Sequence, residues 1–117
     1  MTGRNAGGMS SLEYHVLLAM ADGPLYGYAI KEAVETESAG TLTPRTGSLY
    51  RVLARLMTWG LVAKTEPAEA TLPHPGRERK YYGLTAEGRG ALAAEARRQR
   101  GAAALAEERL GMSEGGP

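Results

Sequence analysis

Basic and hydroxyl side chains gather in the middle third of the chain, where they could bind nucleic acid. Arg51 and Arg55 are four residues apart, so a helix would place both guanidinium groups on one face. Ser48 and Tyr50 add hydroxyl groups that can bind phosphate oxygens. A second basic cluster follows at Arg77, Arg79 and Lys80. These residue types favour the binding of a polyanion.

Residues that could support other chemistry are absent or isolated. The chain has no cysteine, and its two histidines, His15 and His74, come without a carboxylate cluster. Metal sites built from thiolates or imidazoles are therefore not expected. The sequence also lacks a Gly-rich phosphate loop ending in Lys and Ser or Thr, and it lacks a serine nucleophile elbow. We expect no enzyme activity, no metal and no cofactor.

The formal charge of +1 conceals an uneven distribution. Residues 1–40 hold two basic and five acidic groups, residues 41–89 hold eight and four, and residues 90–117 hold four of each. A local basic excess is typical of a nucleic-acid surface, although an ordinary solvated face gives the same pattern. The 117 residues suffice for one domain. Because no apolar run approaches ~18 residues and no secretory signal is evident, a cytoplasmic location is expected.

Apolar spacings of three and four residues predict three helices before residue 60. The first follows an N-cap at Ser10 or Ser11 and stops at residues 21–24, where Gly and Pro end a helix. The second begins just after Pro24 and ends before Gly40.

The third predicted helix carries the basic face. Thr43 is its expected N-cap, Pro44 its first residue and Gly60 its end. Its apolar stripe consists of Leu49, Val52, Leu53 and Leu56. A rotation of about 100° per residue places a polar face opposite this stripe. That face consists of Gly47, Arg51, Ala54, Arg55 and Thr58, with Ser48 and Tyr50 on its flanks.

Two strands and a last helix follow. Residues 61–65 and 79–84 are the expected strands, and the three prolines of residues 66–78 indicate a long hairpin tip. Thr85 is the expected cap of the fourth helix. Its heptad seam consists of Leu92, Ala96, Gln99, Ala103, Ala106 and Leu110. Because this helix has few large side chains, we expect it to pack against a second copy of the chain.

The order of elements predicts a winged helix-turn-helix with a C-terminal dimerisation helix, a mainly α fold with a small β-hairpin (α+β). The expected parts are a disordered lead (1–9), the winged helix (10–84), the dimerisation helix (85–111) and a disordered tail (112–117). In such a fold the third helix enters the major groove of DNA. The alternative is a winged helix that binds protein, which would show apolar groups on the third helix.

Three segments resemble the PadR family of transcriptional regulators. They are residues 18–30 (LAMADGPLYGYAI), residues 47–56 (GSLYRVLARL) with 60–62 (GLV), and residues 77–88 (RERKYYGLTAEG). The resemblance extends over about residues 11–92 and implies a homodimeric repressor of the compact subgroup, bound to a pseudo-palindromic operator. The implied DNA contacts are Tyr28, Lys31, Ser48, Tyr50, Arg51, Arg55, Arg77, Arg79 and Lys80. Tyr28 would either meet the DNA backbone or pack beside Tyr50.

Some compact relatives bind flat aromatic drugs against a tryptophan of the last helix. Here the one tryptophan, Trp59, ends the third helix, and residues 86–117 hold no aromatic residue. A stacking pocket of that kind is therefore not expected. A dimer contact, and a small-molecule effector that releases DNA, would instead involve residues of the first and last helices. These are Leu12, His15, Val16, Ala19, Leu92, Ala96, Gln99 and Leu110.

Overall fold

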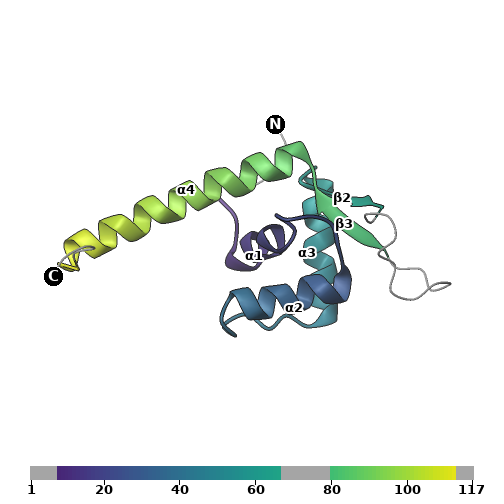
Figure 1. Cartoon of the computed structure of the whole chain (residues 1–117), viewed down its shortest axis with the longest axis horizontal. Coiled ribbons are helices and arrows are strands. Elements are labelled where there is room, and N and C mark those ends of the chain that lie inside the picture. The colour runs from purple at the N-terminus through teal and green to yellow at the C-terminus, as the bar shows by residue number, and fades with distance from the viewer. Residues whose placement is uncertain (1–7, 67–79, 113–117) are drawn as a thin grey trace.

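The computed structural model describes residues 8–66 and 80–112, which form three packed helices, a small sheet and a long fourth helix (Figure 1). The helices are α1 (Ser11–Ala19), α2 (Gly27–Glu37), α3 (Thr46–Thr58) and α4 (Ala86–Arg109). The strands are β1 (Leu25–Tyr26), β2 (Val62–Thr65) and β3 (Tyr81–Leu84). This arrangement confirms the predicted winged-helix architecture. The predicted hairpin tip lies almost entirely outside the described residues.

The sheet has one strand more than the predicted hairpin. β3 is central and antiparallel to both neighbours, with Leu25 of β1 opposite Tyr82 and Val62 of β2 opposite Leu84. A strand of two residues is too short to produce an alternating pattern, so the sequence did not indicate β1. Because these residues pair with β3, the second helix begins at Gly27 and not directly after the proline.

An aliphatic core lies beneath α3 and fixes its orientation. The four residues of the predicted apolar stripe of α3 are all buried, as expected. Full burial of one such side chain contributes about 1.5–3 kcal/mol. The core residues are Val16, Leu17, Met20, Ile30, Val34, Leu49, Val52, Leu53, Leu56, Leu61, Val62 and Tyr82. Met9 also packs against this core, although the sequence placed it in the disordered lead.

Helices α1 and α4 begin with side-chain caps, as predicted. The Oγ of Ser10 accepts the N–H of Glu13 at 3.1 Å, and Oε1 of Glu13 accepts the N–H of Ser10 at 2.9 Å. This reciprocal pair is a capping box. At the start of α4, the Oγ1 of Thr85 accepts the N–H of Gly88 at 2.9 Å. Both caps satisfy backbone groups that a helix start leaves without a partner.

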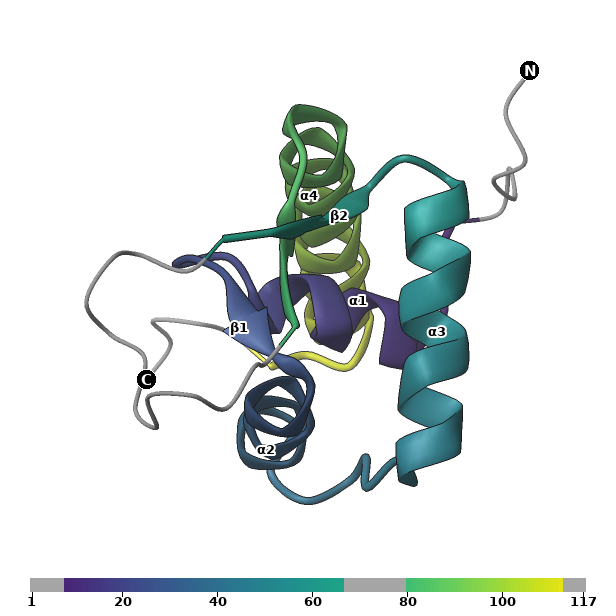
Figure 2. The same ribbon diagram turned by 90° about the vertical axis from the view of Figure 1, so that its right-hand side faces the viewer.

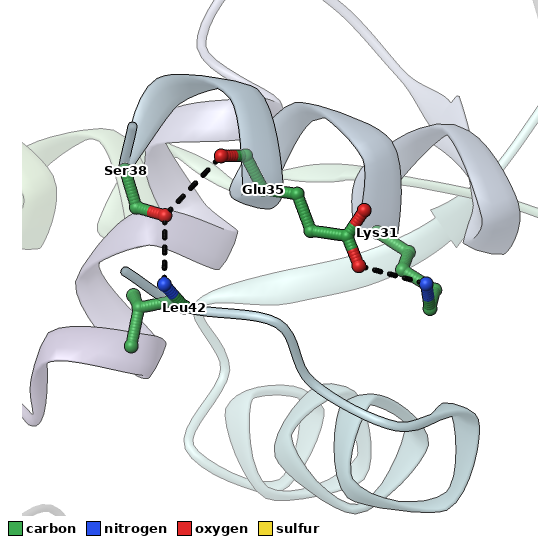
Figure 3. Close-up of polar contacts among 4 residues, drawn as sticks. All are labelled: Lys31, Glu35, Ser38 and Leu42. Atoms are coloured by element: carbon green, nitrogen blue, oxygen red, sulfur yellow. Dashed lines mark hydrogen bonds and ion pairs between the residues drawn. The ribbon is translucent and has the colours of Figure 1, made fainter. Parts of the chain in front are cut away.

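Ser38 fixes the turn that follows α2 (Figure 3). This buried side chain donates through Oγ to the carbonyl oxygen of Glu35 at 3.4 Å. The same Oγ accepts the N–H of Leu42 at 3.0 Å. One serine therefore ties the end of α2 to the chain that leads to α3.

Helix α3 begins later than the sequence indicated. Its N-cap is Arg45, with φ −77° and ψ 161°, and its first residue is Thr46. The expected cap Thr43 and first residue Pro44 precede the helix. The predicted start at Pro44 was wrong because these residues connect α2 to α3. An extended backbone covers about 3.3 Å per residue, against 1.5 Å in a helix, so it spans the distance between two helices with fewer residues.

Helix α4 is only half covered. It has 24 residues and is therefore about 36 Å long. Its first half contacts α1 and β3, whereas residues 97–112 are all exposed. Figure 1 shows this second half projecting away from the other helices. It carries Leu105 and Leu110, which are 43% and 72% exposed.

Substitutions at two glycines of α4 test how closely the first turns of this helix are packed. A Cβ at Gly88 would overlap the carbonyl oxygen of Leu61, whereas a Cβ at Gly90 would meet open space. We expect Gly88→Ala to lower the free energy of unfolding by about 1–3 kcal/mol through overpacking. Gly90→Ala should raise it by up to about 1 kcal/mol, because alanine favours the helix. Denaturant unfolding at one protein concentration compares them, and equal effects would contradict this packing.

Candidate nucleic-acid interface

The face of α3 opposite the core is exposed and polar. Gly47, Arg51, Ala54, Arg55 and Thr58 are exposed, as the helical rotation predicted. Figure 2 shows α3 along one edge of the ribbon, with α1 and α2 on its inner side. In Figure 1 the projecting half of α4 points away from α3. This face is therefore open to a long ligand such as a DNA duplex.

The two arginines of this face have different partners. Among the described residues, Arg51 makes one long contact, within its own helix, from Nη2 to the Oγ of Ser48 at 3.4 Å. Arg55 instead donates from Nε to Oε2 of Glu13 on α1 at 3.0 Å, and its guanidinium lies 5.9 Å from the ring centre of Trp59. Spacing along α3 could not indicate this ion pair, because Glu13 is 42 residues away in the sequence.

The start of α2 lies against Tyr50 of α3. A Cβ on Gly27 would overlap the hydroxyl of Tyr50, so a larger residue there would require the Tyr50 side chain to move. Tyr50 is 44% exposed and Tyr28, in the first turn of α2, is 60% exposed. Tyr28 is therefore accessible to solvent, and its contact with the DNA backbone stays a prediction. The result is a pair of accessible phenol groups where α2 and α3 meet.

The N-termini of α2 and α3 differ from those of α1 and α4. Neither Tyr26, the N-cap of α2, nor Arg45, the N-cap of α3, caps the helix with its side chain. Neither helix has an acidic residue in its first turn, whereas α1 has Glu13 and α4 has Glu87. The first N–H groups of α2 and α3 are therefore not offset by nearby carboxylates. Such helix starts attract phosphate groups.

Lys31 is placed one turn along α2, where it pairs with Glu35 (Figure 3). The distance between Nζ of Lys31 and Oε2 of Glu35 is 2.8 Å. The hydrogen bond that Lys31 donates to Glu35 raises the pKa of Lys31 above its ordinary 10.5. Desolvation opposes this shift, and the charge of Glu35 adds to it, with smaller contributions from Tyr28 and Glu32. The two side chains are only partly buried, and a pair near the surface contributes little to stability. Lys31 could exchange this carboxylate for a phosphate.

The wing is described only in part. Lys80 is exposed and directly precedes β3. Arg77 and Arg79, the other two predicted contacts of the wing, lie outside the described residues.

The residues predicted for a dimer contact or effector pocket divide between the core and the surface. Val16 is fully buried in the core of the single chain and cannot line an exposed pocket. Val16 belongs to the hydrophobic core beneath α3. The other predicted residues are partly buried or exposed: Leu12, His15, Ala19, Leu92, Ala96, Gln99 and Leu110.

A shallow hollow of about 630 Å³ lies between the end of α1 and α2. Its lining combines alanines with the acidic residues Asp22, Glu32, Glu35 and Glu37. These carboxylates disfavour phosphate binding there. Among residues 8–66 and 80–112, no group of three His, Cys, Asp or Glu residues is placed to hold a metal. No helix in that part of the chain is long and apolar enough to span a membrane.

Comparison with known proteins identifies the family of this chain. Residues 16–94 match the family model described as the transcriptional regulator PadR-like family. A 37.1 kDa protein in transposon TN4556 of Streptomyces fradiae is 47% identical over 81 residues, which are 69% of this chain and 21% of that protein. The chain thus spans about a fifth of the length of this curated relative.

Two solved structures show the likeness of fold. A PadR family transcription regulator from Clostridium difficile R20291 has a TM-score of 0.70 at 22% identity, covering 86% of this chain and 99% of that one. Bacillus subtilis PadR in complex with operator DNA has a TM-score of 0.59 at 25% identity, covering 73% and 47%. The chain therefore matches about half of the Bacillus subtilis protein.

The ion pair on α2 gives a test of the electrostatics of this surface. Glu35→Gln should lower the pKa of Lys31 toward 10.5, because the carboxylate that favours the ammonium is removed. Glu32→Gln is the control and should lower it less. Because the pKa of Lys31 is raised on folding, the stabilisation is complete below pH 10.5 and is lost above it. NMR titration of the lysine side chains measures both shifts, and an unchanged Lys31 pKa in Glu35→Gln would contradict the pair.

Proposed function

We propose that this chain, which belongs to the PadR-like family of transcriptional regulators, binds a specific DNA operator as a homodimer and represses transcription. The observation that carries DNA binding is the exposed polar and basic face of α3. Among the described residues of that face and its flanks, Tyr50 is the one large apolar side chain that is exposed. A docking site for protein would be more apolar.

Each part of the surface has a role in this proposal. Arg51 and Arg55 would enter the major groove with α3, and the small residues Gly47 and Ala54 would let the helix approach the bases. The hydroxyl groups of Ser48, Tyr28 and Tyr50, and the free N–H groups at the starts of α2 and α3, would bind phosphates. Lys31 and the wing residues Arg77, Arg79 and Lys80 would add further backbone contacts.

The exposed half of α4 supports the homodimer. Leu105 of this half, the C-cap residue Leu110 and Met112 just after the helix are exposed large apolar side chains. An isolated helix of such composition is only marginally stable in water. A second copy related by a two-fold axis would cover them. The two α3 helices would then meet half-sites of a pseudo-palindrome about 34 Å apart, or a multiple of that distance. A small molecule bound between α1 and α4 would release the operator by changing this spacing.

Leu110→Asp tests the role of α4. We expect a shift from dimer to monomer, because the substitution places a carboxylate in the seam while leaving the core of the single chain untouched. Arg100→Ala, an exposed change on the same half of the helix, is the control. Sedimentation velocity over a range of concentrations measures the change. A Leu110→Asp protein that dimerises as tightly as the parent would exclude this face as the interface.

Arg51→Ala tests DNA binding itself. We expect a loss of about 1–3 kcal/mol in binding free energy where Arg51 meets a base. Fluorescence anisotropy would use a labelled duplex from the region upstream of its own gene, beside a scrambled duplex, at several salt concentrations. Arg100→Ala removes the same charge from the exposed second half of α4 and should bind nearly as the parent does.

The parent protein in the same assay decides between function classes. Tight binding with a preference for the upstream duplex would establish a self-regulating operator, and the salt slope would count phosphate contacts. Weak and equal binding to both duplexes would place the operator elsewhere. No binding even at low salt would favour the protein-binding winged helix.

A further inference from the structure

Glu13 connects the start of α1 to the middle of α3 through both of its carboxylate oxygens. The residue is only 7% exposed. Its Oε1 accepts the N–H of Ser10 at 2.9 Å, and its Oε2 accepts the Nε–H of Arg55 at 3.0 Å. A buried carboxylate is costly unless both oxygens are satisfied, so these two bonds depend on one another. The capping box of α1 thus also holds an arginine on the exposed face of α3.

Arg55 is held at one edge and free at the other. Its Nε is bonded to Glu13, and its guanidinium lies over Trp59. In residues 8–66 and 80–112, this is the only hydrogen bond that the guanidinium makes, and 45% of the side chain is exposed. The two terminal nitrogens, Nη1 and Nη2, are therefore available to a ligand. An arginine fixed in this way loses little conformational freedom when it binds.

The carboxylate also changes what Arg55 is suited to bind. Glu13 offsets the charge of the guanidinium, which weakens its attraction for phosphate. The donors on Nη1 and Nη2 keep their direction, and a fixed fork of two donors matches O6 and N7 of guanine in the major groove. Arg51 has no carboxylate partner among the described residues, so no such offset applies to its charge.

We propose that Glu13 is a positioning residue that makes Arg55 a reader of a base edge, so that a buried acid of α1 sets part of the sequence specificity of α3. The proposal rests on the proposed function, because it requires that α3 binds DNA. It assigns Glu13 to specificity even though Glu13 itself does not reach the DNA.

Glu13→Gln removes the positioning bond with little change in shape. The amide oxygen can still accept the N–H of Ser10, but the amide nitrogen would then face the Nε–H of Arg55, donor against donor. Ser10→Ala is the matched control, since it removes one half of the capping box and keeps the carboxylate for Arg55. Arg55→Lys is a second variant that keeps the charge and the pairing with Glu13 but loses the planar fork.

The assay first enriches duplexes from a random library with the parent protein. Anisotropy then compares the most enriched duplex with a scrambled one, and thermal unfolding of each variant is recorded beside it. We expect Glu13→Gln to lower the ratio of specific to scrambled affinity about tenfold or more. For this variant on the scrambled duplex, the plot of log affinity against log salt concentration should steepen by the amount that about one extra phosphate contact gives. The reason is that the released Arg55 can pair with the DNA backbone.

The controls separate positioning from stability. Ser10→Ala should lower the unfolding temperature and leave the affinity ratio unchanged, whereas Arg55→Lys should lower the ratio and keep the fold. In an Arg55→Ala background, Glu13→Gln should cause no further loss of the ratio. An unchanged ratio in Glu13→Gln, or an additive loss in the Arg55→Ala background, would overturn the proposal while the proposed function stands. If the parent protein enriches no sequence, the proposed function fails and this inference fails with it.

Discussion

The burial of one aliphatic stripe on α3 determines both the fold and the exposed surface of this chain. Leu49, Val52, Leu53 and Leu56 leave water together against α1, α2 and the sheet. Because a helix has two opposite faces, the same contact exposes Arg51 and its neighbours. The chain has no phenylalanine, so this core is assembled mainly from branched aliphatic residues. A close backbone approach at Gly88, where a Cβ would overlap the carbonyl oxygen of Leu61, holds the start of α4 against the chain that leads into β2.

The sequence predicted those features that depend on local periodicity or on a cap. The stripe of α3, the caps at Ser10 and Thr85 and the central strand of the wing follow from such signals. It did not predict β1, because two residues carry no period, or the late start of α3, because the path from α2 requires extended backbone. For the interface, it indicated which residues of α3 are exposed. It could not indicate that Arg55 is paired, because that contact is set only when α1 packs on α3.

The ion pairs change the electrostatic account of the proposed DNA surface. Counting basic residues treats Lys31 and Arg55 as free positive charges, yet each has a carboxylate partner within 3.0 Å. The long-range attraction for DNA is therefore smaller than a count of the predicted basic contacts indicates. In this proposal, affinity depends more on contacts with direction: phenol hydroxyls, the uncapped starts of α2 and α3, and the free edge of Arg55. The phosphate contacts among these would fix the position of the protein on the duplex, and the free edge of Arg55 would read the sequence.

Helix α1 lies between the proposed DNA-binding helix α3 and the proposed dimer helix α4. Helix α1 contacts α4 on one side and α3 on the other. Its first turn holds Arg55 through Glu13, while residues farther along it, including Ala19, lie among those proposed to meet a second copy or an effector. A shift of α1 by a few tenths of an ångström would lengthen a charge-assisted bond that is 3.0 Å long. The dimer surface could therefore influence base recognition through one short helix, without any change in the core that orients α3.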